Sequence, residues 1–320
     1  MSGSVLMRFA IISDTHFVHP TDGTDGTLWN RQIFSRTEEL ANAIVDTLNE
    51  SKVDFVLHCG DLTHHGDLSS LEFAANTFRR LHVPFFTVLG NHDVAVSGAR
   101  DFIANKLGRA SRDFFYSEYI KGVRFIFLDS NFAHVHDETE SEVMEWRKSK
   151  TYFGVGFSTQ QLRYIEEELH RDKGSTTFVV VHHPLASKPE YPRISPRSLG
   201  PAERRLAPVD RSLFPHLGKD VVDILDKHSN VKAVFSGHWH INDIVLRGGI
   251  HYIQTASLVE YPLEYRVVEL SDDYMDISTH SLPGEHLRQQ SLVVEWHNTW
   301  PRGELFDRNR RVHFKELPDE

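Results

Sequence analysis

The 320-residue chain has almost no cysteine, no long apolar run and no excess of positive charge. Its single cysteine, Cys59, cannot form an internal disulfide, so the fold must be held by packing alone, which suits a reducing compartment. No apolar stretch reaches the roughly 20 residues that span a bilayer. The apolar run near the N-terminus lacks a basic leader and ends at Asp14, which does not fit a secretory signal. We therefore expect a cytoplasmic protein that does not contact a membrane.

The balance of charge also limits the partners. The formal net charge is −10, and this opposes binding to the phosphate backbone of a long nucleic acid. A small anionic substrate remains compatible with this charge, provided that the binding site itself is locally positive. The hydrophobic content of 40% and the charged content of 25% are typical of a globular protein of enzyme size.

Short runs rich in β-branched and aromatic residues alternate with segments of helical periodicity, which is the pattern of βαβ units. This alternation predicts strands at 8–14, 53–61, 83–91, 176–184 and 231–240, and helices at 36–51, 68–81, 158–172 and 219–229. Closer-spaced runs predict antiparallel strands at 113–119, 123–130, 243–257, 264–271 and 274–282. The strands are numerous enough for an α/β fold in which two mixed sheets pack face to face.

Three segments do not follow this pattern. We interpret residues 131–153 as an inserted loop or short helix and 186–219 as a second insertion, rich in proline and arginine. Both belong to a domain that spans residues 1–282. Residues 283–320 form a C-terminal extension with several aromatic residues and weak periodicity. We expect it to pack on the body of the molecule or on a partner subunit of a homo-oligomer.

Five of the predicted strands end in polar side chains that bind metals, and packing gives no reason for them there. Because the carboxyl ends of parallel strands share one edge of a sheet, we expect these side chains to converge. The predicted metal ligands are Asp14, His16, Asp61, Asn91, His182, His238 and His240.

The ligand types and their number predict two ions. Oxygen and nitrogen ligands without sulfur suit manganese, iron or zinc, and seven ligands exceed the needs of one tetrahedral ion. A carboxylate can place an oxygen on each of two ions, and Asp61 is the candidate for this bridge. Residues that alternate along a strand point the same way, which would bring His16 beside Asp14 and His240 beside His238. The first ion would then take Asp14, His16 and His240, and the second Asn91, His182 and His238.

Such a centre keeps a positive charge after its two carboxylates are counted, which favours an anion such as a phosphate ester as the substrate. Water held between two ions has a lowered pKa, so that a hydroxide can be the nucleophile and no serine or cysteine is needed. His92, which follows Asn91, is the predicted general acid for the leaving oxygen. Asp93 is predicted to hold the His92 imidazole in orientation.

In order along the chain, the motifs "DTH", "GD", "GNHD", "HH" and "GHWH" resemble the five blocks of the calcineurin-like metallophosphoesterases. The resemblance covers roughly residues 8–260, and the form "GDLTHHG" looks most like the class III cyclic nucleotide phosphodiesterases. It implies a four-layer αββα sandwich and a dinuclear phosphoesterase. It also implies that the seven predicted ligands bind the metals and that His92 is the catalytic histidine.

At two positions the sequence differs from particular branches of this family. Protein serine/threonine phosphatases of the superfamily carry an arginine shortly after the aspartate of "GD", where this chain has Leu62 to Gly66. Pyrophosphohydrolases of the lipid A pathway carry an arginine at the position of His92. We therefore predict a phosphodiesterase that acts on a nucleotide or cyclic nucleotide. A phosphomonoesterase or a nuclease on the same site is the alternative, and a catalytically silent scaffold for protein interaction is the alternative of another class.

Three further residues are predicted to contact the substrate. Residues 186–215 carry six basic and three acidic side chains in a chain that is acidic as a whole. We interpret this segment as a basic flap over the metals, in which Arg193 and Arg197 bind phosphate or sugar. His64 follows the predicted bridging aspartate and is close enough in sequence to reach the substrate. A solvated surface loop is the alternative interpretation of the flap.

Overall fold

The computed structural model describes residues 4–107, 113–135, 140–142, 152–188, 215, 217–292 and 299–314. Arg193, Arg197 and nearly all of the predicted basic flap therefore lie outside the described residues.

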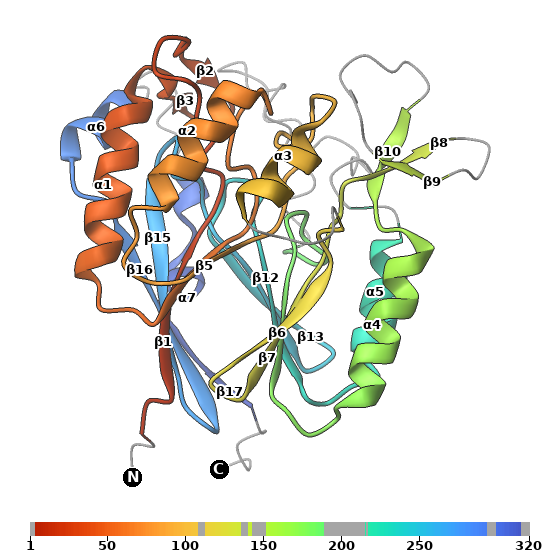
Figure 1. Cartoon of the computed structure of the whole chain (residues 1–320). Helices are drawn as coiled ribbons and strands as arrows, with labels where there is room; N and C mark the ends of the chain where they lie inside the picture. Colours follow the sequence, from red (N-terminus) through yellow and green to blue (C-terminus); the bar gives the residue numbers. More distant parts are fainter. Residues whose placement is uncertain are drawn as a thin grey trace, which may run out of the picture.

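Two six-stranded mixed sheets form the centre of the molecule (Figure 1). The first has the order β17-β16-β15-β1-β4-β5, formed by Arg310–His313, Tyr274–Ser281, Glu264–Leu270, Met7–Ile12, Phe55–His58 and Phe85–Thr87. The second has the order β13-β14-β12-β11-β7-β6, formed by Asp243–Arg247, Ile250–Gln254, Val231–Ser236, Thr177–Val180, Val123–Phe127 and Tyr116–Ile120. The strands β1, β4 and β5 run parallel, as do β7, β11, β12 and β14, so their carboxyl ends meet at a common edge in each sheet.

Helices cover the outer face of each sheet. Figure 1 shows α1, α2 and α6 on one side and α4 and α5 on the other, which confirms the predicted four layers. The helices are α1 (Thr37–Glu50), α2 (Leu68–Phe78), α3 (Ala99–Lys106), α4 (Thr159–Arg171), α5 (Gly218–Leu225), α6 (Glu285–Ser291) and α7 (Leu305–Arg308). Short elements complete the described part: β2 (Gly26–Thr27), β3 (Arg31–Gln32) and the 3-10 turns Phe34–Arg36 and Trp300–Arg302.

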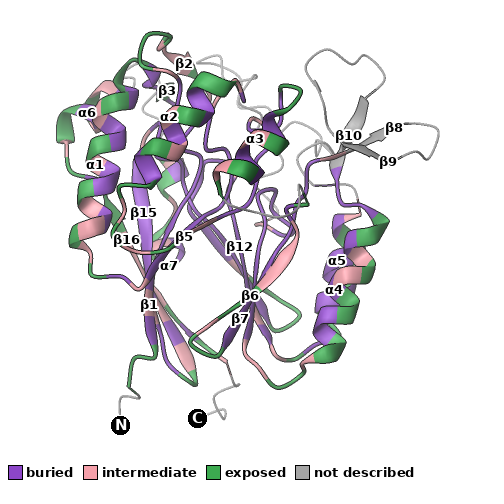
Figure 2. Ribbon diagram, in the orientation of Figure 1, coloured by how far each residue is buried: buried purple, intermediate pink, exposed green. Residues whose placement is uncertain are grey.

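The strands read as continuous apolar runs because both of their faces are buried. In β1, Phe9 and Ile11 point into the layer between the sheets, whereas Ala10 and Ile12 point toward α1 and α2. Aromatic side chains fill the layer between the sheets, where the Phe9 ring stacks on Phe55 at 4.9 Å. The central strands are buried along their length (Figure 2), so the sheets form a rigid base for the loops that follow them.

One predicted segment differs from the expectation. The segment 131–153, interpreted as an inserted loop or short helix, contributes most of a three-stranded sheet in the order β10-β8-β9, formed by Tyr152–Gly156, Phe132–Val135 and Glu140–Glu142. The C-terminal extension adds α6, α7 and β17, and β17 pairs with β16 at the edge of the first sheet. This extension thus packs on the body of its own chain, with Val312 buried in the layer between the sheets. A homo-oligomer stays a prediction.

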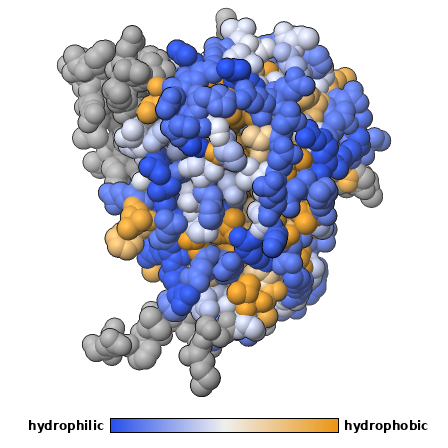
Figure 3. Space-filling model, turned by 90° about the vertical axis from the view of Figure 1, so that its left-hand side faces the viewer, coloured by the Kyte–Doolittle hydropathy of each residue, from blue (hydrophilic) through white to orange (hydrophobic). Residues whose placement is uncertain are grey.

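The surface facing the viewer in Figure 3, on the side of α1, is mainly hydrophilic, with apolar residues in small separate patches. None of the helices in the described part of the chain has the length and apolar character that crossing a bilayer requires.

Candidate metal centre

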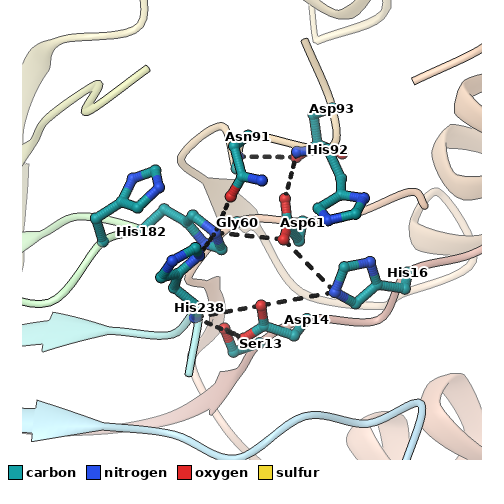
Figure 4. A network of polar contacts seen from close by, with 12 residues as sticks. Ser13, Asp14, His16, Gly60, Asp61, Asn91, His92, Asp93, His182 and His238 are labelled. Atoms are coloured by element: carbon teal, nitrogen blue, oxygen red, sulfur yellow. Dashed lines mark hydrogen bonds and ion pairs between the residues drawn. The ribbon is translucent and has the colours of Figure 1, made fainter. Parts of the chain in front are cut away.

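The polar residues at the strand ends gather at one edge of the molecule, between the two sheets (Figure 4). Loops after β1, β4 and β5 of the first sheet bring Asp14, Asp61 and Asn91 to this edge. Loops after β11 and β12 of the second sheet bring His182 and His238. The structure thus brings the predicted ligands together from both sheets, whereas the shared edge of parallel strands accounts for convergence only within each sheet.

Three of these side chains form a first group. The Nε2 atom of His240 lies 3.4 Å from Asp14 Oδ1 and 3.1 Å from His16 Nε2. The Nε2 atom of His16 lies 3.8 Å from the same oxygen of Asp14. Asp14 and His240 are more than 220 positions apart in the sequence. All three side chains are buried. This is the set that was predicted to hold the first ion.

A second group lies beside the first. The Nε2 atom of His182 lies 3.2 Å from Asn91 Oδ1 and 3.2 Å from His238 Nδ1. Asp61 stands between the two groups, since its Oδ2 atom is 3.3 Å from His182 Nε2 and 3.5 Å from His16 Nε2. A single carboxylate oxygen therefore faces nitrogen atoms of both groups. This is the position that a carboxylate shared by two ions would take.

The backbone around these residues is not extended. Side chains that alternate along a strand point the same way only where the backbone is extended. Asp14 and His16 do lie together, but the chain coils after each strand instead of continuing it. The left-handed backbone costs energy in residues with a side chain and is concentrated at functional sites. The residues of the site with positive φ are Asp14 (50°), His16 (44°), Asp61 (57°), His238 (72°) and His240 (57°).

Hydrogen bonds and close packing hold these coils in place. The backbone N–H of Asp14 donates to Gly60 O and that of His16 to Asp61 O, both at 3.0 Å, which joins the loop after β1 to the loop after β4. Gly90 packs directly against the central carboxylate, because a Cβ atom on it would lie 2.0 Å from Asp61 Oδ1. Glycine is therefore required at position 90 by contact with Asp61, and not by the backbone conformation.

The charges of the site are strongly coupled. Burial alone would raise the pKa of Asp61, but the imidazoles of His182, His92 and His16 outweigh it and hold this pKa well below its usual value. Burial would likewise lower the pKa of His182, yet the Asp61 carboxylate raises it to about 9. Burial lowers the pKa of His238 to about 3, and the neighbouring His182 adds to this effect. The site therefore keeps its carboxylates charged, as a cation centre requires.

His92 lies at the open side of this cluster. Its backbone N–H donates to Asp61 Oδ1 at 2.8 Å, and its ring lies 4.7 Å from the ring of His16. The Nδ1 atom is 2.7 Å from the carbonyl oxygen of His64. A carbonyl only accepts, so Nδ1 carries the proton in this contact. The ring of His64 stacks on the ring of His92 at 4.9 Å, which places His64 beside the site as well.

The structure corrects the role of Asp93. Its carboxylate accepts the backbone N–H groups of Gly90, Leu62 and Thr63 at 2.9 to 3.1 Å, and the Thr63 hydroxyl at 3.2 Å. The imidazole Nδ1 of His92 instead has the His64 carbonyl as its partner. Asp93 is fully buried and joins the loop after β4 to the loop after β5. It therefore shapes the backbone that carries the site and does not orient the His92 ring.

Other polar residues support the site without having been predicted to. His183 follows the predicted ligand His182, and its ring packs 4.2 Å from that of His238, while its Nδ1 lies 2.7 Å from Ser130 Oγ. Glu260 contacts His240 and was not predicted at all. The only signal in the sequence is a carboxylate in the otherwise apolar run "SLVEYP". Nothing in its spacing relates it to the ligand motifs.

The chemistry of the donors fits a mixed oxygen and nitrogen metal centre. Every group of three or more potential metal-binding side chains found in the described residues belongs to this one cluster. Its donors are carboxylates, imidazoles and one amide, without sulfur, which suits manganese, iron or zinc. Cys59 is buried, and burial raises the pKa of its thiol, so it behaves as a core residue.

Comparisons with known proteins agree with this geometry. A family model described as calcineurin-like phosphoesterase matches residues 7–242. A probable glycerophosphodiester phosphodiesterase of Arcobacter nitrofigilis is 26% identical and is aligned over 68% of each chain. A 3',5'-cyclic-nucleotide phosphodiesterase of Nostoc sp. is 25% identical over 69% of each chain. Among solved structures, a dimetal phosphatase from Danio rerio superposes with a TM-score of 0.69 at 17% identity, over 98% of this chain and all of that one.

Proposed function

Since the chain belongs to the calcineurin-like phosphoesterase family and is thus a metal-dependent phosphoester hydrolase, we propose that it is a phosphodiesterase with two metal ions. Its proposed substrate is a nucleotide or cyclic nucleotide. The observation that carries this proposal is the position of Asp61, whose Oδ2 atom faces His16 on one side and His182 on the other. A site for a single ion has no need of such a shared carboxylate.

In the proposed centre, Asp14, His16 and His240 would hold one ion, Asn91, His182 and His238 would hold the other, and Asp61 would serve both. When bound, the pair of ions supplies an activated water at neutral pH and a positive charge that polarises the phosphoryl oxygens. The residues of the chain fix the distance between the two groups and exclude water from behind them, because six of the seven side chains, all but that of His238, are buried. Manganese, iron and zinc all suit these donors.

His92 has the position of a general acid in this proposal. Its Nδ1–H is bound by the His64 carbonyl, so the ring is fixed, and in the imidazolium form the second proton sits on Nε2, from which it passes to the leaving oxygen of the ester and leaves a neutral imidazole. His64 stacks on this ring, and we propose that it contacts the substrate from the same side. Arg193 and Arg197 stay proposed substrate contacts on sequence grounds alone. If replacing them with alanine leaves KM unchanged, the basic flap is refuted.

Two features favour a diester as the substrate. Both sequence relatives described above carry names of phosphodiesterases. The chain also has no arginine at the two positions that distinguish the protein phosphatases and the lipid A pathway enzymes, where it has Leu62 to Gly66 and His92. A phosphomonoesterase or nuclease would use the same centre. A silent scaffold is not favoured, because the chain retains all seven predicted ligands and His92. The single buried cysteine favours a cytoplasmic location.

The direct test compares substrates on protein loaded with Mn²⁺. We expect hydrolysis of bis-p-nitrophenyl phosphate, cyclic AMP or a glycerophosphodiester to exceed that of p-nitrophenyl phosphate. Protein treated with a chelator, and the D61N variant, serve as controls and should be inactive. A higher rate on the monoester would favour the phosphomonoesterase. Two bound ions without hydrolysis of any ester would favour the scaffold.

A further inference from the structure

The carboxylate of Glu260 is completely buried behind the first group of predicted ligands. It lies in the segment between β14 and β15. Its Oε1 atom is 2.5 Å from His240 Nδ1, and its Oε2 atom accepts the backbone N–H groups of Trp29 at 3.2 Å and Asn30 at 2.7 Å. A buried carboxylate is costly unless it is well paired, and this one meets donors on both oxygens. Its position is therefore built by the fold.

The contact fixes the state of the His240 ring. Because a carboxylate accepts, the Nδ1 atom of His240 carries the proton, and Nε2 is the nitrogen that faces Asp14 Oδ1 and His16 Nε2. Carboxylates behind metal-bound histidines orient the ring and raise its basicity as a ligand. Glu260 thus contacts the side of His240 that is opposite to the predicted ion.

In the second group of ligands, the described residues place a backbone carbonyl and not a carboxylate behind the ring of His182. The Nδ1 atom of His182 has the backbone carbonyl of Cys59 as its partner, at 2.8 Å. A neutral carbonyl orients the ring in the same way but adds less to its basicity than a carboxylate does. The two halves of the centre are therefore supported by chemically different partners, although their ligands look alike.

Glu260 also joins the loop of His240 to distant parts of the chain. The indole N–H of Trp29 donates to the carbonyl of Trp239 at 2.7 Å, on the residue just before His240. The Trp29 ring packs edge-on against Trp300 of the C-terminal extension at 4.4 Å. The loop that carries His240 is thus held from one side by Glu260 and from the other by Trp29.

We propose that Glu260 is a positioning residue that makes the site of Asp14, His16 and His240 the tighter of the two metal sites. This inference rests on the proposed two-metal function. Glu260 acts through His240 and does not touch an ion or the substrate. Loss of its carboxylate should weaken one of two binding events selectively.

The test is a calorimetric titration of Mn²⁺ into metal-free protein. For the wild type we expect two binding events of unequal affinity. In E260Q the tighter event should weaken by about 10- to 100-fold, as for other partners behind metal-bound histidines. The weaker event should keep its affinity. E39Q is the matched control, because Glu39 also pairs with a histidine, His286 at 2.6 Å, on the exposed surface.

A second comparison separates positioning from general stability. In an H240A background, E260Q should cause no further loss of Mn²⁺ affinity, since the residue through which Glu260 acts is absent. If E260Q does not fold, E260D replaces it in both titrations, because it keeps the charge but draws the carboxylate away from His240. Its tighter event should also weaken.

Unchanged affinity of both events in the folded variants, or the same loss in the H240A background, would overturn the inference. The titration involves no substrate, so it is independent of the proposed hydrolysis. Wild-type protein that binds two ions and hydrolyses no ester would refute the proposed function and leave the role of Glu260 intact.

Discussion

At the scale of single residues, the centre depends on close contacts behind the ligands. Asp61 shows this most clearly, since its Oδ1 atom accepts the backbone N–H of His92 and its Oδ2 atom faces both groups of ligands. A displacement of about 1 Å at such a residue can lower a rate by about 100-fold. Small changes behind the ligands should therefore affect the metals as much as changes of the ligands themselves.

The substitution G90A tests this packing. The added Cβ would lie 2.0 Å from Asp61 Oδ1 and 2.2 Å from its backbone nitrogen, so Asp61 must move. We expect loss of bound metal and a fall in turnover of about 100-fold, measured by elemental analysis and by hydrolysis of a diester. In the control G174A, the nearest atom lies at 3.7 Å, an ordinary contact, and metal content should not change. A G90A protein with full metal content would show that Asp61 is not held in this way.

Replacement of His92 tests the division between binding and catalysis. The ring contacts the site through its edge to His16 and is not among the predicted ligands. In H92N we expect turnover to fall by about 100- to 10,000-fold, the usual share of a general acid, with both ions retained. H170N changes an exposed histidine on α4 and should leave turnover unaltered. Loss of metal from H92N would assign His92 to the ligands instead.

At the scale of the elements, the strands support the site because they are rigid and buried, and this burial extends to titratable groups. His251 on β14 is buried, and burial together with the charge of Arg310 lowers its pKa to about 4. An unfolded histidine has a pKa near 6.5. Between pH 4 and pH 6.5, His251 is therefore protonated in the unfolded chain and neutral in the folded chain. The free energy of unfolding should thus decrease as the pH falls from about 6.5 toward 4.

The substitution H251Q should remove this part of the pH dependence. Urea denaturation at several pH values between 7 and 4 gives the free energy of unfolding of the variant and of the wild type. Over this range the wild type should lose more of this free energy than H251Q does, by at most about 3 kcal/mol. H82Q changes a histidine on the exposed surface and controls for the change of residue type. Parallel pH profiles of the wild type and H251Q would contradict a buried, neutral His251.

The elements that the sequence predicted are those with strong periodicity or long apolar runs. The strands of both sheets other than β17, and helices α1, α2, α4 and α5, fall within their predicted ranges or within two residues of them, since burial on one or two faces leaves a clear pattern. Helix α3 and strand β17 were missed. In α3 the side chains of Ala99 and Ile103 pack on a small separate cluster, and β17 has a single buried residue, Val312. Elements that contribute so little to the core leave little periodicity.

At the scale of the whole molecule, the sequence allowed the convergence of the ligands to be predicted but not the groups behind them. Asp14 and Asp61 could be placed together because parallel strands of one sheet end at a common edge, and His238 reaches them from the second sheet. Glu260 and Asp93 could not, because their partners are His240 and backbone N–H groups whose positions depend on the coils after the strands. The left-handed conformation of Asp14 and its neighbours leaves only a weak signal in the residue types, since it occurs at Asp and His, which adopt it more often than other side chains but far less readily than glycine.

The ions should also contribute to the stability of the whole molecule, since their ligands come from both sheets. A ligand that binds only the folded state at 100 times its Kd adds about 2.7 kcal/mol. We expect treatment with a chelator to lower Tm by several degrees and added Mn²⁺ to restore it. The variant D61N should lose most of this dependence. Equal Tm values with and without metal would contradict a centre that joins the two sheets.

The central claim is that two ions share Asp61 between the two sheets. Anomalous diffraction from crystals grown with Mn²⁺ tests it most directly. We predict two peaks about 3.5 to 4 Å apart, one beside Asp14, His16 and His240 and the other beside Asn91, His182 and His238, with the Asp61 carboxylate in contact with both. A single peak, or peaks away from these side chains, would contradict the account.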